Sequence, residues 1–233
     1  MSDRESDAQA RVYLERADEY DALISAEDAD GRLRDAFLAA APFDGARVVD
    51  VGAGTGRLSR WLVDRAARLE LVERAAPMLD VARRRLEGAG DRARFHVADA
   101  RALPLEDASV DHAVAGWVFG HFRHWMPDGW REEVDQAIAE MRRVVKPGGA
   151  VVILETLGTG HEVPRTGSAL DVYFEHLEAA HGFTRAWHRS DYVFDDVEAA
   201  ARVMGGFFGE PLVARIREEG WTRVPECTAL LVG

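Results

Sequence analysis

The spacing of apolar and polar positions changes near residue 45. In residues 8–40 apolar side chains recur at three- to four-residue steps, which predicts helices, and Asp30 with Gly31 predicts a break between them. Pro42 and Gly45 predict the end of this helical region. Beyond it, short apolar runs alternate with helical stretches. The expected strands are residues 48–51, 69–73, 93–98, 110–116 and 150–156, and the expected helices between them are residues 57–67, 77–86 and 130–145.

The alternation of strands and helices predicts how the sheet is built. Such strands pair in parallel through right-handed crossovers, and helices then cover both faces. After Thr156 the alternation weakens, and we expect the late helices to lie near the carboxyl ends of the strands. The late helices are expected at residues 168–180, 197–208 and 211–219, and the late strands at residues 183–194 and 221–232. The pattern predicts an α/β fold with a doubly wound, mostly parallel seven-stranded sheet, N-terminal helices and a late helical insertion.

Length and composition predict one domain. The chain has 233 residues, of which 47% are hydrophobic, enough for a single buried core. No repeat and no Ser/Pro-rich linker interrupts it. We therefore expect a single domain over residues 1–233, with N-terminal helices in 1–44, a ligand-binding core in 45–157, and substrate-side helices and last strands in 158–233.

Charge and cysteine content narrow the range of partners. The chain carries 29 basic and 41 acidic residues, a net charge of −12, which repels phosphates, so no nucleic-acid partner is expected. The start of the chain is too charged for a signal peptide, and no apolar run reaches the roughly 18 residues that span a bilayer, so no membrane partner is expected. Cys227 is the only cysteine, which excludes an internal disulfide and fits a cytoplasmic protein. Monomer and dimer both stay open.

A glycine cluster follows the first predicted strand. Gly52 and Gly54 allow a tight turn and a close approach of the backbone to a ligand, and Gly56 lets the next helix start against the strand. The free N–H groups of that helix suit an anionic group. Because ligands of open α/β sheets bind at the carboxyl ends of the strands, this loop is the first candidate binding site.

Two acidic residues end the next two strands. Glu73 closes the second strand, where a carboxylate accepts hydrogen bonds from ribose hydroxyls, and Asp99 closes the third, where a carboxylate accepts from the exocyclic amine of an adenine. Taken singly, either residue is equally well explained as a solvated acid at a strand end. Their occurrence in register with the glycine loop favours a nucleoside-containing ligand.

Four segments together carry a family resemblance. VVDVGAGTGRLS, LELVERAAPML, HVADARALPLEDASVDHAVAG and MRRVVKPGGAVVILE resemble, in order, the motifs of class I S-adenosylmethionine-dependent methyltransferases of the small-molecule type, similar to methyltransferase domain 11. The resemblance implies a Rossmann-like fold, S-adenosylmethionine as cofactor, and methyl transfer to a small molecule. It runs from about Val48 to Glu155.

The resemblance also implies which residues hold the cofactor. The loop after the first strand would hold the methionine part, Glu73 the ribose, and Asp99 with Ala100 the adenine. Gly116 would line the methionine end, and Tyr13 or Tyr20 would close over the cofactor, with ordinary helix packing as the alternative for each tyrosine. The implied cofactor-binding residues are Tyr20, Asp50, Gly52, Ala53, Gly54, Gly56, Glu73, Asp99, Ala100 and Gly116.

Three other functions stay open. One is a protein or RNA methyltransferase, and another is a cofactor-binding, methyltransferase-like protein with a different activity. The third is a nicotinamide-dependent oxidoreductase, whose fingerprint is G-x-G-x-x-G. This chain has G-x-G-x-G, and Arg57 stands where the third glycine of that fingerprint falls.

The stretch after the fourth predicted strand is the candidate for the reaction itself. His121 is the candidate general base because imidazole titrates near neutral pH, with a structural histidine as the alternative. Glu155 ends the fifth strand and is the second candidate, to bind a substrate amine or take a proton, or else a simple strand-end acid. The aromatic residues that could enclose an apolar acceptor, or else belong to the core, are Trp117, Trp125, Tyr173, Trp187 and Phe194.

Histidines in the last third raise the question of a metal. His161, His176, His181 and His188 lie near Glu175 in the sequence. Because His181 comes five positions after His176, one helix face does not present both side chains, and we predict no metal site.

Overall fold

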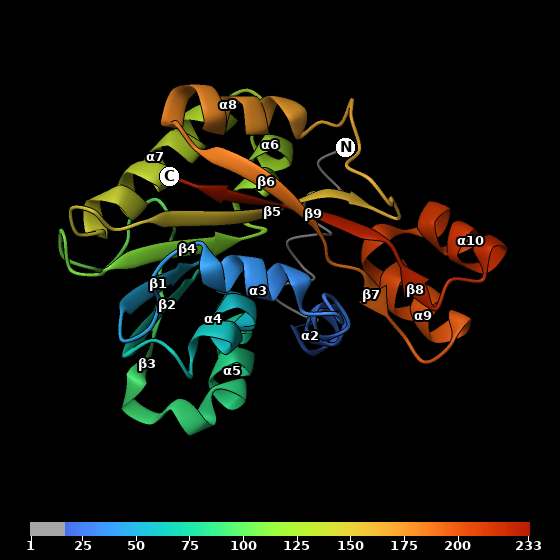
Figure 1. Cartoon of the computed structure of the whole chain (residues 1–233), viewed down its shortest axis with the longest axis horizontal. Coiled ribbons are helices and arrows are strands. Elements are labelled where there is room, and N and C mark those ends of the chain that lie inside the picture. The colour runs from blue at the N-terminus through green and yellow to red at the C-terminus, as the bar shows by residue number, and fades with distance from the viewer. Residues whose placement is uncertain (1–16) are drawn as a thin grey trace.

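A seven-stranded sheet organises residues 17–233, the part of the chain that the structure, a computed structural model, describes (Figure 1). The order across the sheet is β3-β2-β1-β4-β5-β9-β6. β1 to β5 pair in parallel, and β9 runs antiparallel to both β5 and β6. The sheet strands are β1 (Arg47–Val51), β2 (Arg68–Glu73), β3 (Ala93–Val97), β4 (His112–Gly116), β5 (Val151–Thr159), β6 (Thr184–Arg189) and β9 (Glu226–Val232). The predicted doubly wound, mostly parallel seven-stranded sheet is confirmed.

Helices cover both faces of the sheet, as the alternation predicts (Figure 1). One face carries α3, α4 and α5, and the other carries α6, α7 and α8. The helices are α2 (Ala17–Ser25), α3 (Arg32–Ala39), α4 (Arg57–Leu62), α5 (Ala76–Arg85), α6 (Phe122–Trp125), α7 (Trp130–Val144), α8 (Asp171–His181), α9 (Val197–Phe208) and α10 (Glu210–Glu219), with short 3₁₀ turns at Glu87–Arg92 and Phe119–His121. Each helix among residues 17–233 is too short or too polar to cross a bilayer.

Strand residues point alternately into two buried cores. Val49 and Val51 of β1 face the core under α7 and α8, whereas Val48 faces the core under α3 and α4. Ile138 of α7 and Phe37 of α3 are fully buried at the centres of these two cores. Because both faces of every central strand are covered, the strands read as continuous apolar runs.

Among the expected elements, one helix ends early and two strands divide. The predicted helix 57–67 ends at Leu62, whose carbonyl accepts from Arg65 N and Ala66 N in a turn that leads into β2. The predicted strand 183–194 divides into β6 and β7 (Tyr192–Val193), and strand 221–232 into β8 (Arg223–Val224) and β9. Pro225 interrupts the latter because it has no N–H for the ladder.

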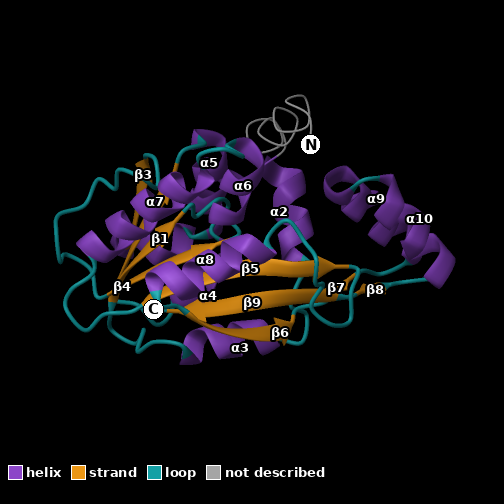
Figure 2. Ribbon diagram, turned by 90° about the horizontal axis from the view of Figure 1, so that it is seen from above, coloured by secondary structure: helices purple, strands orange, loops and turns teal. Residues whose placement is uncertain are grey.

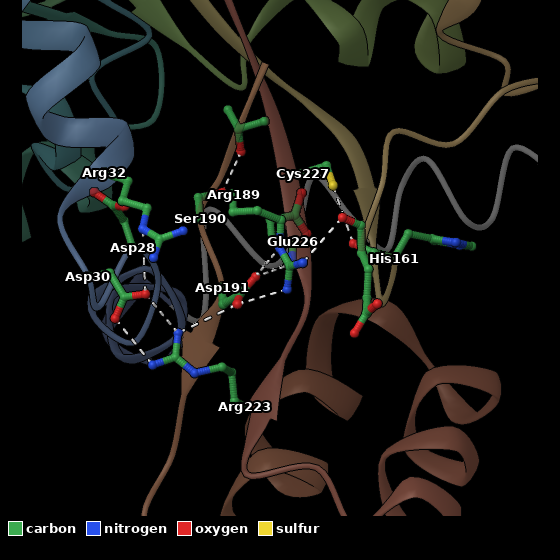
Figure 3. Close-up of polar contacts among 12 residues, drawn as sticks. Asp28, Asp30, Arg32, His161, Arg189, Ser190, Asp191, Arg223, Glu226 and Cys227 are labelled. Atoms are coloured by element: carbon green, nitrogen blue, oxygen red, sulfur yellow. Dashed lines mark hydrogen bonds and ion pairs between the residues drawn. The ribbon is translucent and has the colours of Figure 1, made fainter.

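The short β7–β8 ribbon carries α9 and α10 beyond the carboxyl end of β5, where the late helices are expected, whereas α8 packs on the sheet face that α7 covers (Figures 1 and 2). Polar contacts fix its base (Figure 3). Asp191 accepts two hydrogen bonds from Arg189, at 2.8 and 2.9 Å, and one from Glu226 N at 3.1 Å. Arg223 reaches Asp30, in the loop after α2, at 3.2 Å. These contacts join the N-terminal helices to the last third of the chain.

The turn between α7 and β5 has no room for a side chain at Gly149. A Cβ added there would lie 2.1 Å from the carbonyl oxygen of Asp111 and 2.5 Å from Cγ1 of Val145. A backbone oxygen cannot move aside as the end of a side chain can, so the turn itself must shift.

We therefore predict that Gly149→Ala lowers the free energy of unfolding by about 1–3 kcal/mol, the range for overpacking. Urea unfolding of the purified protein measures it. Gly88→Ala is the control, because nothing lies within 4 Å of a Cβ at Gly88. Equal stabilities of the two variants would contradict the prediction.

Candidate functional site

A cavity of about 530 Å³ lies at the carboxyl ends of β1, β2, β3 and β4. This is the edge at which open α/β sheets bind ligands. Its lining residues are Tyr20, Gly52, Gly54, Val72, Glu73, Arg74, Ala75, Met78, Ala98, Asp99, Ala100, Arg101, Gly116, Trp117, Val118, His121, Phe122, Trp125 and Met126. Seven of the ten predicted cofactor-binding residues are in this set, and Asp50, Ala53 and Gly56 are not.

The glycine loop brings its backbone to the cavity. Gly54 has φ +55°, and a Cβ added there would meet only the methyl end of Met78, at 3.5 Å. Its backbone thus borders open space, as the close-approach argument requires. Gly56 packs against Ala82 of α5 instead, with 3.4 Å to a Cβ built on it, so its role is to bring α4 against α5.

Asp50 lies beneath this loop and supports it. It is buried, and its Oδ2 accepts hydrogen bonds from Ser59 N at 3.1 Å and from Ser59 Oγ at 2.7 Å. Burial raises the pKa of Asp50 to about 7 in spite of these hydrogen bonds. Asp50 therefore ties the end of β1 to α4, the two elements that the glycine loop connects.

Glu73 and Asp99 both line the cavity, but different groups hold the two carboxylates in place. Glu73 accepts from Gly54 N at 3.2 Å and from Ala75 N at 2.8 Å, and burial raises its pKa. Asp99 is held in a two-pronged pair by Arg101, with N–O distances of 2.7 Å to both of its oxygens, and these hydrogen bonds lower its pKa. The sequence analysis did not anticipate Arg101, although the Asp-x-Arg spacing is a signal for such a local pair.

Aromatic side chains form the other part of the cavity wall. Trp117 follows β4 with φ +56°, a backbone conformation rare for a bulky residue. His121 stacks on Trp125, with ring centroids 5.0 Å apart and planes 10° apart. Burial lowers the pKa of His121 to about 4, with a smaller contribution from His124, so the imidazole is neutral at pH 7.

The other expected aromatic residues lie elsewhere. Tyr173 is fully buried against Trp130, Trp187 is 46% exposed on the edge strand β6, and Phe194 packs with the α9–α10 cluster. Tyr20 does line the cavity, and its ring contacts Phe207 of α9 edge-on at 5.9 Å. Burial raises the pKa of Tyr20 to about 12. Tyr13 lies outside the described residues.

Glu155 lies behind the cavity wall and is absent from the lining set. Its Oε2 accepts from Gly120 N at 3.0 Å, and its Oε1 accepts from Thr156 N at 3.2 Å. Burial raises the pKa of Glu155 to about 7. The carboxyl group thus anchors the turn that carries His121, one residue beyond Gly120.

A buried ion pair underlies this region, and the sequence analysis missed it. Arg57 pairs with Glu27, with side chains 9% and 1% exposed, and its guanidinium lies 3.3 Å from the ring centroid of Trp117. Burial lowers the pKa of Arg57, but the charge of Glu27 and smaller contributions from Tyr192 and Tyr20 together outweigh burial, so the pKa is raised overall. The position of Arg57, directly after Gly56, could have indicated a role at the site. Nothing in the sequence near Glu27 indicates that it is the partner of Arg57.

Glu226, at the start of β9, is a further buried acid beside this pair. Its Oε1 accepts from the Thr156 hydroxyl at 2.6 Å. Burial raises its pKa to about 8, and the negative charge of Glu27 adds to the rise. Glu226 is thus protonated at neutral pH.

The histidines of the last third lie outside the cavity. The expectation that a spacing of five positions keeps His176 and His181 apart is wrong, because both side chains reach Asp135 of α7 at 2.6 Å. His176 lies inside α8, and His181 is the last residue of that helix.

A family model described as a methyltransferase domain matches residues 49–153. The demethylmenaquinone methyltransferase of Thermus thermophilus is 38% identical over 111 residues, covering 47% of this chain and 46% of that protein. The ubiquinone/menaquinone biosynthesis C-methyltransferase UbiE of Hahella chejuensis is 34% identical over 134 residues, covering 55% of this chain and 49% of that protein. This chain spans about half the length of the curated relatives it matches.

Solved structures share the fold over a larger part of the chain. A methyltransferase from Aquifex aeolicus superposes with a TM-score of 0.53 at 15% identity, covering 88% of this chain and 93% of its own. The cyclase SpnF superposes with a TM-score of 0.56 at 22% identity, covering 86% of this chain and 79% of its own. At these identities the likeness establishes the fold.

The raised pKa of Glu226 predicts the pH dependence of stability. Folding raises the pKa of this carboxyl from 4.5 to about 8. Its contribution to stability is therefore fully present at pH values below the unfolded-state pKa, and it is lost as the pH rises through the folded-state pKa. Glu226→Gln removes the titration and keeps an oxygen that accepts from Thr156. It should raise the melting temperature by about 2–4 °C near pH 8.5 and leave it close to wild type near pH 4.

Differential scanning fluorimetry across this pH range measures the effect, with exposed Glu106→Gln as the control. A gain in melting temperature that is the same at both pH values would contradict a buried, protonated Glu226.

Proposed function

We propose that this chain, whose residues 49–153 form a class I methyltransferase domain, transfers a methyl group from S-adenosylmethionine to a small-molecule acceptor. One observation carries the proposal. The polar part of the cavity, with the glycine loop, Glu73 and Asp99, joins the aromatic part at Gly116 and Trp117. A cofactor and an acceptor bound in these two parts would meet beside the end of β4.

The residues present fit the proposed cofactor. The backbone at Gly54 borders open space, which suits the methionine part. Glu73 accepts two backbone hydrogen bonds, and a carboxylate has about four acceptor positions, so it can still accept from ribose hydroxyls. Asp99 and Ala100 would frame the adenine, with Arg101 holding the Asp99 carboxylate in place. When bound, S-adenosylmethionine supplies an electrophilic methyl group on a sulfonium centre.

The wall of the aromatic part of the cavity favours a planar, apolar acceptor. His121, Trp125 and Phe122 line the cavity, and an aromatic lining favours flat apolar ligands. The names of several relatives specify quinone biosynthesis, which agrees with a ring-containing acceptor. We therefore propose an aromatic or quinol-like small molecule.

The chain's contribution to the reaction is to position, to exclude water and to accept a proton. Positioning two reactants in a closed apolar site accounts for a large part of the rate of an in-line displacement. His121 is neutral at pH 7 and is the one imidazole in the cavity wall among the described residues, so we assign it as the base. Because its pKa is near 4, its effect on rate should fall toward the low end of the range for general bases.

The alternatives give different results in one experiment. Isothermal titration with S-adenosylmethionine and with NADH identifies the cofactor, and incubation with labelled S-adenosylmethionine and a panel of phenols and quinols identifies methyl transfer. Binding of S-adenosylmethionine without transfer to any small molecule, peptide or RNA would favour another reaction on this fold. Binding of NADH instead would favour an oxidoreductase. The net charge of −12 disfavours RNA as the acceptor.

Glu73→Ala should weaken S-adenosylmethionine binding by about 1–3 kcal/mol, because two ligand hydroxyls would lose their buried acceptor. Calorimetry on the folded variant measures it, and Glu198→Ala, on the exposed side of α9, is the matched control. Unchanged affinity in a folded Glu73→Ala would remove this residue from the proposed site.

His121→Ala should lower turnover by about 10²-fold while the affinity for S-adenosylmethionine stays near wild type. The comparison is with His124→Ala, which removes a neighbouring histidine that does not line the cavity. The pH–rate profile should also lose an ascending limb near pH 4, the value to which burial lowers the pKa of His121. Full turnover with an unchanged profile would reject His121 as the base and leave the methyltransferase proposal intact.

A further inference from the structure

A cluster of two histidines and one aspartate joins α7 to α8 on the sheet face opposite α3, α4 and α5 (Figure 1). Asp135 belongs to α7, and His176 and His181 belong to α8. None of the three lines the cavity at the carboxyl ends of the strands. The cluster is therefore separate from the proposed methyl-transfer site.

The three side chains converge on one point. Oδ1 of Asp135 lies 2.6 Å from Nε2 of His176 and 2.6 Å from Nε2 of His181. All three potential ligand atoms lie within 4.8 Å of one another. The side chains of His176 and His181 are 14% and 12% exposed, whereas that of Asp135 is 47% exposed, so solvent reaches the cluster from the aspartate side.

Because α8 ends at His181, this side chain can meet that of His176 although the two are five positions apart. Gly182 follows His181 in the left-handed conformation with φ +71°. The backbone carbonyl of His181 accepts from Arg142 of α7 at 2.5 Å, and the ring of His176 packs edge-on against Trp130 at 5.5 Å. Trp130 thus contacts the ring of His176, and Arg142 holds the backbone of His181 at the end of α8.

We propose that Asp135, His176 and His181 bind a divalent first-row transition-metal cation. Two imidazole nitrogens and one carboxylate oxygen suit a borderline ion such as Zn²⁺, with water completing the coordination on the exposed side. Each imidazole binds through Nε2 and keeps its proton on Nδ1, so the ion replaces the two hydrogen bonds to Asp135. Magnesium and calcium, which prefer all-oxygen sites, are excluded by the same ligand set.

The ion would brace two helices that pack on the same core. Tyr173 of α8 and Trp130 of α7 are in contact with ring centroids 6.4 Å apart, both buried. Metal bound across these helices stabilises the folded state, because Asp135 is 41 and 46 positions from the two histidines along the chain and joins them only when α7 packs on α8. The proposal thus predicts a stabilising site that is independent of the methyl acceptor.

The test titrates the full chain, without an affinity tag and after treatment with a chelator, with zinc sulfate against a chromogenic zinc indicator. We expect one zinc ion per chain and a melting temperature that rises with zinc concentration. His176→Ala and Asp135→Asn should each lower zinc affinity at least about tenfold and abolish the rise in melting temperature. His188→Ala, which changes a half-buried histidine on β6, should behave as wild type.

Asp135→Asn keeps the shape of the side chain, so it separates loss of binding from loss of fold, and circular dichroism without metal checks the fold. His181→Gln provides a second variant for the same purpose. Zinc affinity that is unchanged in the folded Asp135→Asn and His181→Gln variants would overturn the proposal, as would absence of one-to-one binding to the wild type. Magnesium chloride at the same concentration should leave the melting temperature unchanged.

Discussion

The buried ion pair between Arg57 and Glu27 is the contact on which the geometry of the cavity depends. A guanidinium removed from water is stable only with its counter-charge in place, and removing one partner of such a pair costs about 3–5 kcal/mol. Arg57 begins α4 directly after the glycine loop, Glu27 follows α2, and Trp117 lies over the guanidinium at the end of β4. One charge requirement therefore fixes three separate segments at the mouth of the sheet, including the helix that carries Tyr20.

Side chains at this edge serve the fold and the site together. Glu73 accepts from the backbone of the glycine loop, so the carboxylate proposed to bind ribose also holds the loop in position. Glu155 does the same for the turn that carries His121, although its own side chain stays behind the wall. A ligand in the cavity would thus meet groups whose positions are set beforehand by hydrogen bonds, which reduces the entropy lost on binding.

The local spacing of apolar residues predicted the helices and strands, but it did not predict ion pairs between residues that are distant in the sequence. Short, largely apolar runs that alternate with helical stretches predicted the parallel strands, and the strand-end positions of Gly54, Glu73 and Asp99 followed from that order. Whether a strand-end acid faces the cavity or the interior is decided by packing, so Glu155 and Asp50 could not be placed from spacing. The partner of Arg57 lies thirty residues earlier, and the meeting of His176 with His181 depends on where α8 ends. Neither is encoded in a local period.

The same fold carries methyltransferases and a cyclase, so the sheet alone does not determine the reaction. In this chain the segments beyond the strand ends at the cavity are the aromatic turn after β4 and Tyr20, which contacts Phe207. The stacked pair of His121 and Trp125 combines a flat apolar surface with a neutral nitrogen, since burial lowers the pKa of the imidazole. A charged imidazolium in the same place would repel a sulfonium cofactor. Burial of this histidine therefore makes one wall compatible with both a cationic methyl donor and an apolar acceptor, and that compatibility follows from desolvation rather than from the fold.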